Sequence, residues 1–219
     1  MSTNETTTEM KTPYQHVEAL YASYAARREA IRTRLDEFAR VKPEEYLYEL
    51  IYCLLTPQSS AIHAAKAVER LRALDGLEDT EAVARILAER DHYIRFHRTK
   101  AKHICELQRR YAAILPILTN GLNSVELRAW LVRNVKGLGW KEASHFLRNI
   151  GHRNLAILDR HILKNLKKHR VIRSIPKTLT PKRYLSIEQK FHRFADAVGI
   201  PMDELDLLFW SGETGEILK

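Results

Sequence analysis

Two glycines, a lysine and an aspartate stand at spacings that suit chemistry on a nucleic acid. The segment GLGWK contains Gly137, Gly139 and Lys141, and Asp159 follows the lysine by 159 − 141 = 18 residues. A glycine turn between two helices adopts positive φ and brings backbone N–H groups close to an anion such as a phosphate. In the first turn of the next helix, Lys141 is expected to have a lowered pKa, because the helix dipole and nearby basic groups disfavour its ammonium form. A neutral lysine amine is the nucleophile that forms Schiff bases.

Each of these residues also has a purely structural explanation. The two glycines can serve a helix–helix corner that needs them for packing alone, and a lysine is usually a solvated surface residue. Asp159 precedes an apolar-periodic run, ILKNL, and so can be a helix N-cap. The cap is compatible with function, since one carboxylate can cap a helix and also present an oxygen to a cleft. There Asp159 would stabilise positive charge that develops on a sugar.

The charge of the chain favours a polyanionic partner. The 219 residues carry a net charge of +9, with 45% hydrophobic and 29% charged residues. This describes a globular protein that prefers nucleic acid first and an anionic membrane surface second. The two cysteines, Cys53 and Cys105, fall in apolar stretches and are too few for a four-cysteine zinc or iron–sulfur site. The ten histidines lack ligand spacing, so neither a metal nor another cofactor is expected.

The elements that must position these residues are helices. Apolar residues recur at three- and four-residue steps, prolines and glycines separate the segments, and no strand alternation is clear. The stretch 155–158 leaves a short strand open. The fold class is therefore all-α, with a polar, disordered tail at 1–13. No membrane-length stretch or signal region occurs, which predicts an intracellular, cytoplasmic protein without a membrane partner. Helices are expected over residues 14–40, 43–56, 60–74, 80–90, 98–115, 124–134 and 140–149, and again after Asp159.

Three segments together resemble a known superfamily. GLGWK followed 18 residues later by LDRHI resembles the helix–hairpin–helix DNA glycosylases, whose bifunctional members have a catalytic lysine two residues after the second hairpin glycine and an aspartate at this distance. The stretch 50–71, LIYCLLTPQSSAIHAAKAVERL, resembles the segment that supplies a wedge residue to the duplex. The ending DELDLLFWSGETGEILK resembles the type-2, archaeal-type 8-oxoguanine DNA glycosylases. Two features depart from related branches: the loop NIGHRNLAIL lacks a proline, and the four-cysteine cluster of the endonuclease III-like and adenine glycosylases is absent.

The resemblance implies a fold and an activity. The fold is two helical lobes with the helix–hairpin–helix and the active-site cleft between them: residues 14–57 with 135–219 form one lobe, and 58–134 form the other. The activity is excision of 8-oxoguanine from DNA, followed by β-elimination at the abasic site through a Schiff base. Lys141 would attack the sugar, and Asp159 would stabilise the cationic sugar.

The DNA contacts follow from the same resemblance and from charge. Gln58, beside Ser59, would fill the gap left by an extruded base. The glycine hairpin at 137 and 139 would grip the backbone, and Arg160 and His161 would meet phosphates, because no acidic residue falls between Asp159 and Glu188. The basic stretch 92–104 is either a solvated face or a second DNA contact. The expected partner is double-stranded DNA containing oxidised guanine, bound by a monomer.

Discrimination of the damaged base is assigned to the last residues. Guanine and 8-oxoguanine differ at N7, an acceptor in the first and an N–H donor in the second, so a selective pocket needs an acceptor aimed at N7. The α-carboxylate of Lys219 can supply it, with Trp210 supporting or stacking on the base.

Two other functions remain open from the sequence. A non-catalytic helix–hairpin–helix module explains the charge and the glycines, but gives Lys141 and Asp159 no purpose. An oxidised-pyrimidine glycosylase/lyase keeps the chemistry and changes the substrate.

Overall fold

The computed structural model describes residues 13–217 of the chain. This part is all-α, as predicted, with ten α-helices, two short 3-10 helices (η1 and η2) and no strand. The tail expected at 1–13 lies outside the described residues except for its last position. The helices are α1 (Val17–Ala39), η1 (Pro43–Glu45), α2 (Tyr46–Leu55), α3 (Ala61–Arg72), α4 (Thr80–Leu87), η2 (Arg90–His92), α5 (His97–Thr119), α6 (Ser124–Asn134), α7 (Trp140–Asn149), α8 (Arg160–Lys168), α9 (Pro181–Val198) and α10 (Met202–Thr214).

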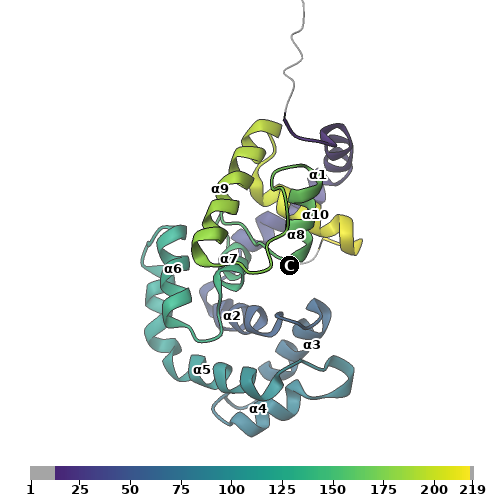
Figure 1. The fold of residues 1–219 in the computed structure, drawn as a ribbon. Coiled ribbons are helices and arrows are strands. Elements are labelled where there is room, and N and C mark those ends of the chain that lie inside the picture. The colour runs from purple at the N-terminus through teal and green to yellow at the C-terminus, as the bar shows by residue number, and fades with distance from the viewer. Residues whose placement is uncertain (1–12, 218–219) are drawn as a thin grey trace, which may run out of the picture.

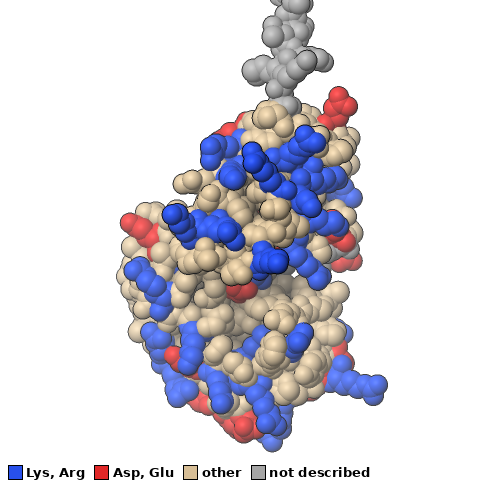
Figure 2. Space-filling view, viewed as in Figure 1, with Lys and Arg blue, Asp and Glu red and all other residues tan. Residues whose placement is uncertain are grey.

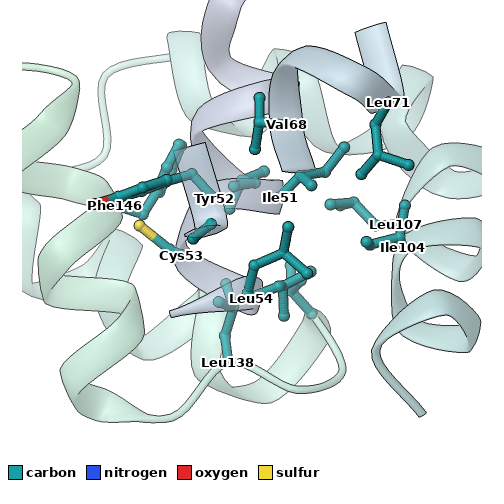
Figure 3. Close-up of a cluster of buried hydrophobic side chains, with 14 of the residues drawn as sticks. Ile51, Tyr52, Cys53, Leu54, Val68, Leu71, Ile104, Leu107, Leu138 and Phe146 are labelled. Carbon is teal, nitrogen blue, oxygen red and sulfur yellow. The ribbon is translucent and has the colours of Figure 1, made fainter. Parts of the chain in front are cut away.

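The helices form two groups, one from the middle of the chain and one from its two ends. Figure 1 shows α1, α8, α9 and α10 in the upper part and α2 to α5 in the lower part, with α7 where the two meet. The buried apolar side chains divide in the same way: one cluster extends from Leu50 to Leu155, and the other joins α1 to residues 156–209. Figure 3 shows the first cluster around α2, where Ile51 and Leu54 lie among side chains of α3 and α5. The molecule therefore has two hydrophobic cores, and the first and the last described helices, α1 and α10, both belong to the second one.

The expected lobe limits differ from these clusters in two helices. The limits 14–57 with 135–219 place α2 and α7 in the lobe made by the chain ends. The buried side chains of α2 and α7 instead belong to the cluster of the middle segment. The clusters describe packing, and the lobe limits stay a prediction.

Capping residues in the sequence explain where several helices begin. Asn123 Oδ1 accepts hydrogen bonds from the backbone N–H groups of Val125 and Glu126 at the start of α6, at 3.1 and 3.0 Å. Thr180 caps α9 in the same way through Arg183 N, with Pro181 at the first helical position. Such side chains satisfy N–H groups that have no partner inside the helix, so these boundaries are visible in the sequence.

Two expectations differ from the structure. The helix expected to end at residue 115 continues to Thr119, with Pro116 inside it. Pro116 stands in the last turns, where it removes one helical hydrogen bond, and the buried Ile114 and Leu118 on either side favour continuation. The stretch 155–158 is extended but pairs with no strand in the described part of the chain, so the short strand left open there does not form.

No helix among the described residues is long and apolar enough to cross a membrane.

Candidate active site between the two groups of helices

The glycine hairpin joins α6 to α7, as the sequence predicts. Gly137 has φ +91°, and a Cβ there would lie 2.4 Å from His103 Nδ1 and 3.0 Å from Leu54 Cδ2, so both conformation and space require glycine. Gly139 differs from the expectation of positive φ. Its φ of −90° is ordinary extended backbone, and it serves as the N-cap of α7. There its N–H donates to Glu142 Oε2 at 3.2 Å, the reciprocal half of a capping box.

Lys141 lies in the first turn of α7 beside a carboxylate. Its Nζ is 3.2 Å from Glu142 Oε1, and a quarter of its side chain is exposed, which keeps the amine within reach of solvent and ligand. Glu142 therefore holds the hairpin through one oxygen and the Lys141 ammonium through the other. The sequence predicted the position of Lys141 at the helix start and missed this acidic neighbour.

Asp159 is the N-cap of α8. Its Oδ1 accepts hydrogen bonds from the backbone N–H groups of His161 and Ile162, both at 2.8 Å. Both cap bonds use one oxygen, so Oδ2 has no hydrogen-bond partner among the described residues. The cap and a functional oxygen are thus compatible in this geometry, and the cap fixes the orientation of the carboxylate.

A cleft of about 1010 Å³ brings most of the predicted residues together. Figure 2 shows the hollow between the upper and lower parts of the molecule, with Lys and Arg side chains around it. The glycines of the hairpin lie outside its lining. Lys219 lies outside the described residues, so its role stays a prediction. The predicted residues that line the cleft are Lys141, Asp159, Gln58, Ser59, Arg160, His161 and Trp210.

A buried ion pair lies at the floor of the cleft. Arg148 Nη1 is 2.9 Å from Asp206 Oδ2, both side chains are more than nine-tenths buried, and both residues line the cleft. Burial, together with the nearby carboxylates of Asp159 and Asp203, raises the pKa of Asp206 to about 7 against the opposing charge of Arg148. Asp206 Oδ1 has no partner among the described residues. The floor beneath Asp159 is therefore acidic, with one guanidinium as its counter-charge.

Sequence reasoning missed this floor, although one signal for it was present. Lys141, His145 and Arg148 stand at i, i+4 and i+7, which places them on one face of α7. All three line the cleft. The spacing of Asp203 and Asp206 on α10 gave no comparable signal, because helices of every kind carry acidic pairs.

A buried hydrogen-bond network fixes the segment that leads into Asp159. Arg128, fully buried on α6, donates to both oxygens of Glu188 at 2.5 and 2.7 Å and to Ser144 Oγ at 3.1 Å. Glu188 Oε2 in turn accepts the N–H of Ala156 at 2.8 Å. Because Ser144 is on α7, the network ties the helix of Lys141 to the segment of Asp159. Arg128 Nε has no hydrogen-bond partner among the described residues, but the bonds that the network does make rigidify the groups that they join.

Basic residues of α8 form the outer edge of the cleft. Arg160 Nε lies 3.1 Å from His161 Nε2. The carboxylate of Glu213 on α10 accepts two hydrogen bonds from Lys164 Nζ, at 3.0 and 2.9 Å. Its Oε2 also lies 3.7 Å from His161 Nδ1. Glu213 therefore contacts two basic side chains of α8.

Within the described residues, one group has the atoms to hold a metal ion: Glu89, Asp91 and His92 around η2. His92 Nδ1 lies 2.8 Å from Asp91 Oδ1, and its Nε2 lies 3.8 Å from Glu89 Oε2. The two ring nitrogens of this buried imidazole therefore face different carboxylates. None of the three residues lines the cleft.

The fold and this site define a helix–hairpin–helix DNA glycosylase. The family model described as 8-oxoguanine DNA glycosylase (Ogg-HhH) matches residues 31–200, and the chain belongs to this family. A relative from Fusobacterium nucleatum, named 8-oxoguanine DNA glycosylase/AP lyase, is 42% identical in an alignment of 216 residues that covers 94% of this chain and 97% of the relative. One from Korarchaeum cryptofilum, with the same name, is 43% identical in an alignment of 199 residues that covers 88% of this chain and 91% of the relative.

Solved structures agree with this assignment. The 8-oxoguanine glycosylase/lyase of Methanocaldococcus jannaschii, solved in complex with a 15mer DNA containing 8-oxoguanine, has a TM-score of 0.81 and 34% identity, covering 92% of this chain and 100% of that one. The 8-oxoguanine DNA glycosylase of Thermotoga maritima has a TM-score of 0.82 and 32% identity, covering 93% of this chain and 98% of that one. Both the fold and its helix–hairpin–helix are therefore those of this family.

Proposed function

We propose that the protein excises 8-oxoguanine from DNA and then cleaves the strand at the abasic site. The observation that carries this is the placement of Lys141 and Asp159, each at the start of a helix, on one cleft. The curated relatives at 31–43% identity are named 8-oxoguanine DNA glycosylase/AP lyase. The target base must leave the duplex stack to reach such a cleft.

In the first step, the neutral amine of Lys141 attacks C1′ of the deoxyribose. The N-glycosidic bond breaks, and the base departs with the bonding electrons and takes up a proton. Glu142, 3.2 Å from Lys141 Nζ, is placed to receive the proton that the ammonium must first lose. Asp159, above the acidic floor, stabilises the positive charge that develops on the sugar.

In the second step, the sugar ring opens to a Schiff base between C1′ and Lys141. The cationic imine acidifies the C2′ proton. Its removal forms a C2′=C3′ double bond and expels the phosphate from C3′, so the strand breaks on the 3′ side of the lesion. Water then hydrolyses the imine and regenerates the lysine.

The DNA is held by contacts that carry little sequence information. The hairpin at Gly137 and Gly139, together with Arg160 and His161, meets phosphates, and Gln58 and Ser59 face the gap that the extruded base leaves. Phosphate contacts of this kind position a duplex without reading its sequence. The partner is therefore double-stranded DNA containing oxidised guanine, bound by a monomer, and light scattering with and without duplex tests that stoichiometry.

Selection of the damaged base is assigned to Trp210 and to the carboxylate of Lys219. Trp210 lines the cleft and offers a ring to the flipped base. An acceptor aimed at N7 favours 8-oxoguanine over guanine by roughly 1–3 kcal/mol, the cost of a buried polar mismatch. Residues added after Lys219 should erode discrimination between the two bases and spare cleavage of abasic sites. Undiminished selectivity in the extended protein would contradict this role.

Borohydride trapping on a duplex with one 8-oxoguanine tests the lysine. The wild type should form a covalent adduct, and peptide mapping should place it on Lys141. The Lys141→Gln variant should form none, while still binding duplex. A variant that traps as well as the wild type would remove Lys141 from the mechanism.

A panel of duplexes, each with one lesion, separates the alternatives. Excision of 8-oxoguanine ahead of oxidised pyrimidines supports the proposal, and the reverse order favours an oxidised-pyrimidine glycosylase. Binding without excision of any lesion would favour a non-catalytic helix–hairpin–helix module.

A further inference from the structure

Lys100 is a buried cation that faces the back of the cleft and has no part in the mechanism above. Its side chain on α5 is only 7% exposed. Its ammonium donates to the carbonyl oxygens of Leu55 and Pro57, both at 2.7 Å, and to Ser59 Oγ at 3.4 Å. The first acceptor is at the end of α2, and the other two belong to the connection between α2 and α3, whose residues 56–60 line the cleft.

This connection contains a β-turn with an unusual third residue. Ser59 N donates to Thr56 O at 3.1 Å, which closes a turn with Pro57 and Gln58 in its central positions. Gln58 has φ +55°. A proline followed by a residue of positive φ is the pattern of a type II turn, in which glycine or asparagine is usual at the third position. A glutamine there is strained and needs external support.

The orientation of one peptide group decides the form of the turn. Type I and type II turns differ by a flip of the peptide that joins the two central residues, which reverses its carbonyl and changes φ of the next residue from negative to positive. Here that carbonyl belongs to Pro57, and Lys100 Nζ holds it at 2.7 Å. The hydrogen bond therefore acts on the group that sets the conformation of Gln58.

We propose that Lys100 is a positioning residue: by holding Pro57 O it keeps the turn in its type II form and keeps Gln58 pointed for entry into the duplex. This inference rests on the proposed function, which uses Gln58 to fill the gap left by the flipped base. Gln58 itself is exposed at the cleft, so it has no packing of its own to hold it.

Two further contacts explain why an ammonium serves better here than an apolar side chain. The carbonyl of Leu55 is at the end of α2, where carbonyls lack helical partners and the helix dipole favours a cation. Ser59 Oγ also accepts Arg95 N at 3.1 Å, so a second element supports the same turn. Burial and the neighbouring Lys141 lower the pKa of Lys100 to about 8, opposed by Glu142, and three acceptors keep it in place.

The Lys100→Met variant separates steps that need duplex invasion from those that do not. With the turn free to flip, the DNA concentration for half-maximal excision of 8-oxoguanine from duplex should rise about tenfold. Cleavage of an abasic site in single-stranded DNA should stay within about twofold of the wild type, because no base must be extruded and Lys141 and Asp159 are untouched. A loss of stability alone would affect both substrates equally.

A fluorescent base reports the insertion directly. With 2-aminopurine in the strand opposite the lesion, wild-type binding should raise fluorescence by unstacking that base, and Lys100→Met should reduce the rise. Lys190→Met, which removes an exposed lysine from α9, is the control for the loss of one charge. The inference would be overturned if Lys100→Met had the same half-saturating duplex concentration and the same fluorescence rise as the wild type. It would also be overturned if the variant lost as much activity on single-stranded abasic DNA as on duplex.

If Lys100→Met does not fold, the Lys100→Arg variant tests the positioning role of Lys100 instead. It keeps the charge, but its planar guanidinium cannot direct donors as the ammonium does, so the half-saturation on duplex should rise by a smaller factor with single-stranded cleavage intact. Wild-type behaviour of Lys100→Arg would then contradict the inference. An inactive wild type on the same duplex would contradict the proposed function instead.

Discussion

The phenol of Tyr184 holds the backbone of Ala156 from inside the core. Its Oη donates to Ala156 O at 2.6 Å and accepts the N–H of Leu158 at 3.2 Å, and the ring is almost fully buried. Tyr184 therefore supplies the partners that a neighbouring strand would give this extended segment. The segment ends at Asp159, so a hydroxyl on α9 determines where the carboxylate lies.

Replacing Tyr184 with phenylalanine should loosen that carboxylate. The variant leaves a buried carbonyl and a buried N–H unpaired, which should lower the free energy of unfolding by about 1–3 kcal/mol. Single-turnover kinetics should show a lower excision rate at saturating duplex, with the half-saturating concentration little changed. Tyr21→Phe is the control, because Tyr21 also donates to a distant carbonyl, Val198 O at 3.1 Å, but is 45% exposed. Equal kinetics in the two variants would contradict a positioning role for Tyr184.

The ion pair of Arg148 and Asp206 should make stability depend on pH when it is broken. Asp206 binds its proton more tightly in the folded protein, with a pKa of about 7 against an ordinary 3.8, so its contribution to stability falls as pH rises through this range. Arg148→Leu removes the counter-charge, so the variant keeps the Asp206 proton to higher pH, and its stability deficit should grow by about 1.4 kcal/mol for each pH unit above 7. Melting temperatures should therefore separate variant and wild type little at pH 5 and widely at pH 8.

The double variant Arg148→Leu with Asp206→Asn provides the matched control for this pH effect. It has no titrating carboxyl at this position, so its deficit relative to the wild type should vary much less between pH 5 and pH 8. A widening deficit in the double variant would assign the effect to another group, such as Asp203, whose pKa burial also raises.

Gly137→Ala should damage the hairpin through two separate costs. The positive φ penalises any Cβ by about 1 kcal/mol, and the contact at 2.4 Å with His103 adds a steric cost. Gly121→Ala isolates the first cost, because Gly121 also has positive φ (+80°) with no described atom within 4 Å of an added Cβ. Thermal melts should rank Gly137→Ala below Gly121→Ala, and duplex affinity should fall only in the former. Equal melting temperatures of the two variants would show that His103 moves away from the added Cβ without a measurable steric cost.

The Gln58→Gly variant should be more stable than the wild type but less active on duplex DNA. Glycine relieves a left-handed residue of about 1–2 kcal/mol and costs about 0.5–1 kcal/mol in chain entropy, so the variant should gain up to about 1.5 kcal/mol. It also removes the side chain proposed to fill the gap, so excision from duplex should fall while single-stranded abasic cleavage persists. A variant with both higher stability and full duplex activity would remove Gln58 from the proposed DNA contacts.

Short-range features of this fold could be predicted, and long-range ones could not. The cap at Asp159, the hairpin and the start of α7 depend on residues within four positions of one another, so spacing in the sequence contains them. The ion pair of Arg148 with Asp206 joins residues that are 58 positions apart in the sequence, and the hydrogen bond from Lys100 to Pro57 O joins residues 43 positions apart. Such partners depend on how α5 packs on α2 and α10 on α7, which apolar periodicity does not specify.

The same limit applies to the candidate site. The sequence predicted that Lys141 and Asp159 belong to one site, and both line the same cleft. Glu142 as the partner of Lys141 was missed, because a glutamate next to a lysine is common on any helix. The structure shows the role of this side chain: one oxygen of Glu142 accepts a hydrogen bond from Gly139 N, and the other lies beside Lys141 Nζ.

The chain path has a consequence for how the protein is made. Helix α1 packs chiefly on α10 and shares its buried cluster with α8 and α9, yet the whole of α2 to α7 is translated between α1 and these helices. On the ribosome the middle core is complete in sequence while α1 still lacks its partners, so α1 must wait, its apolar face uncovered, until the last helices emerge. The cleft takes residues from both groups of helices. A nascent chain therefore acquires its site in one late event, and an unfinished one never has the cleft at all.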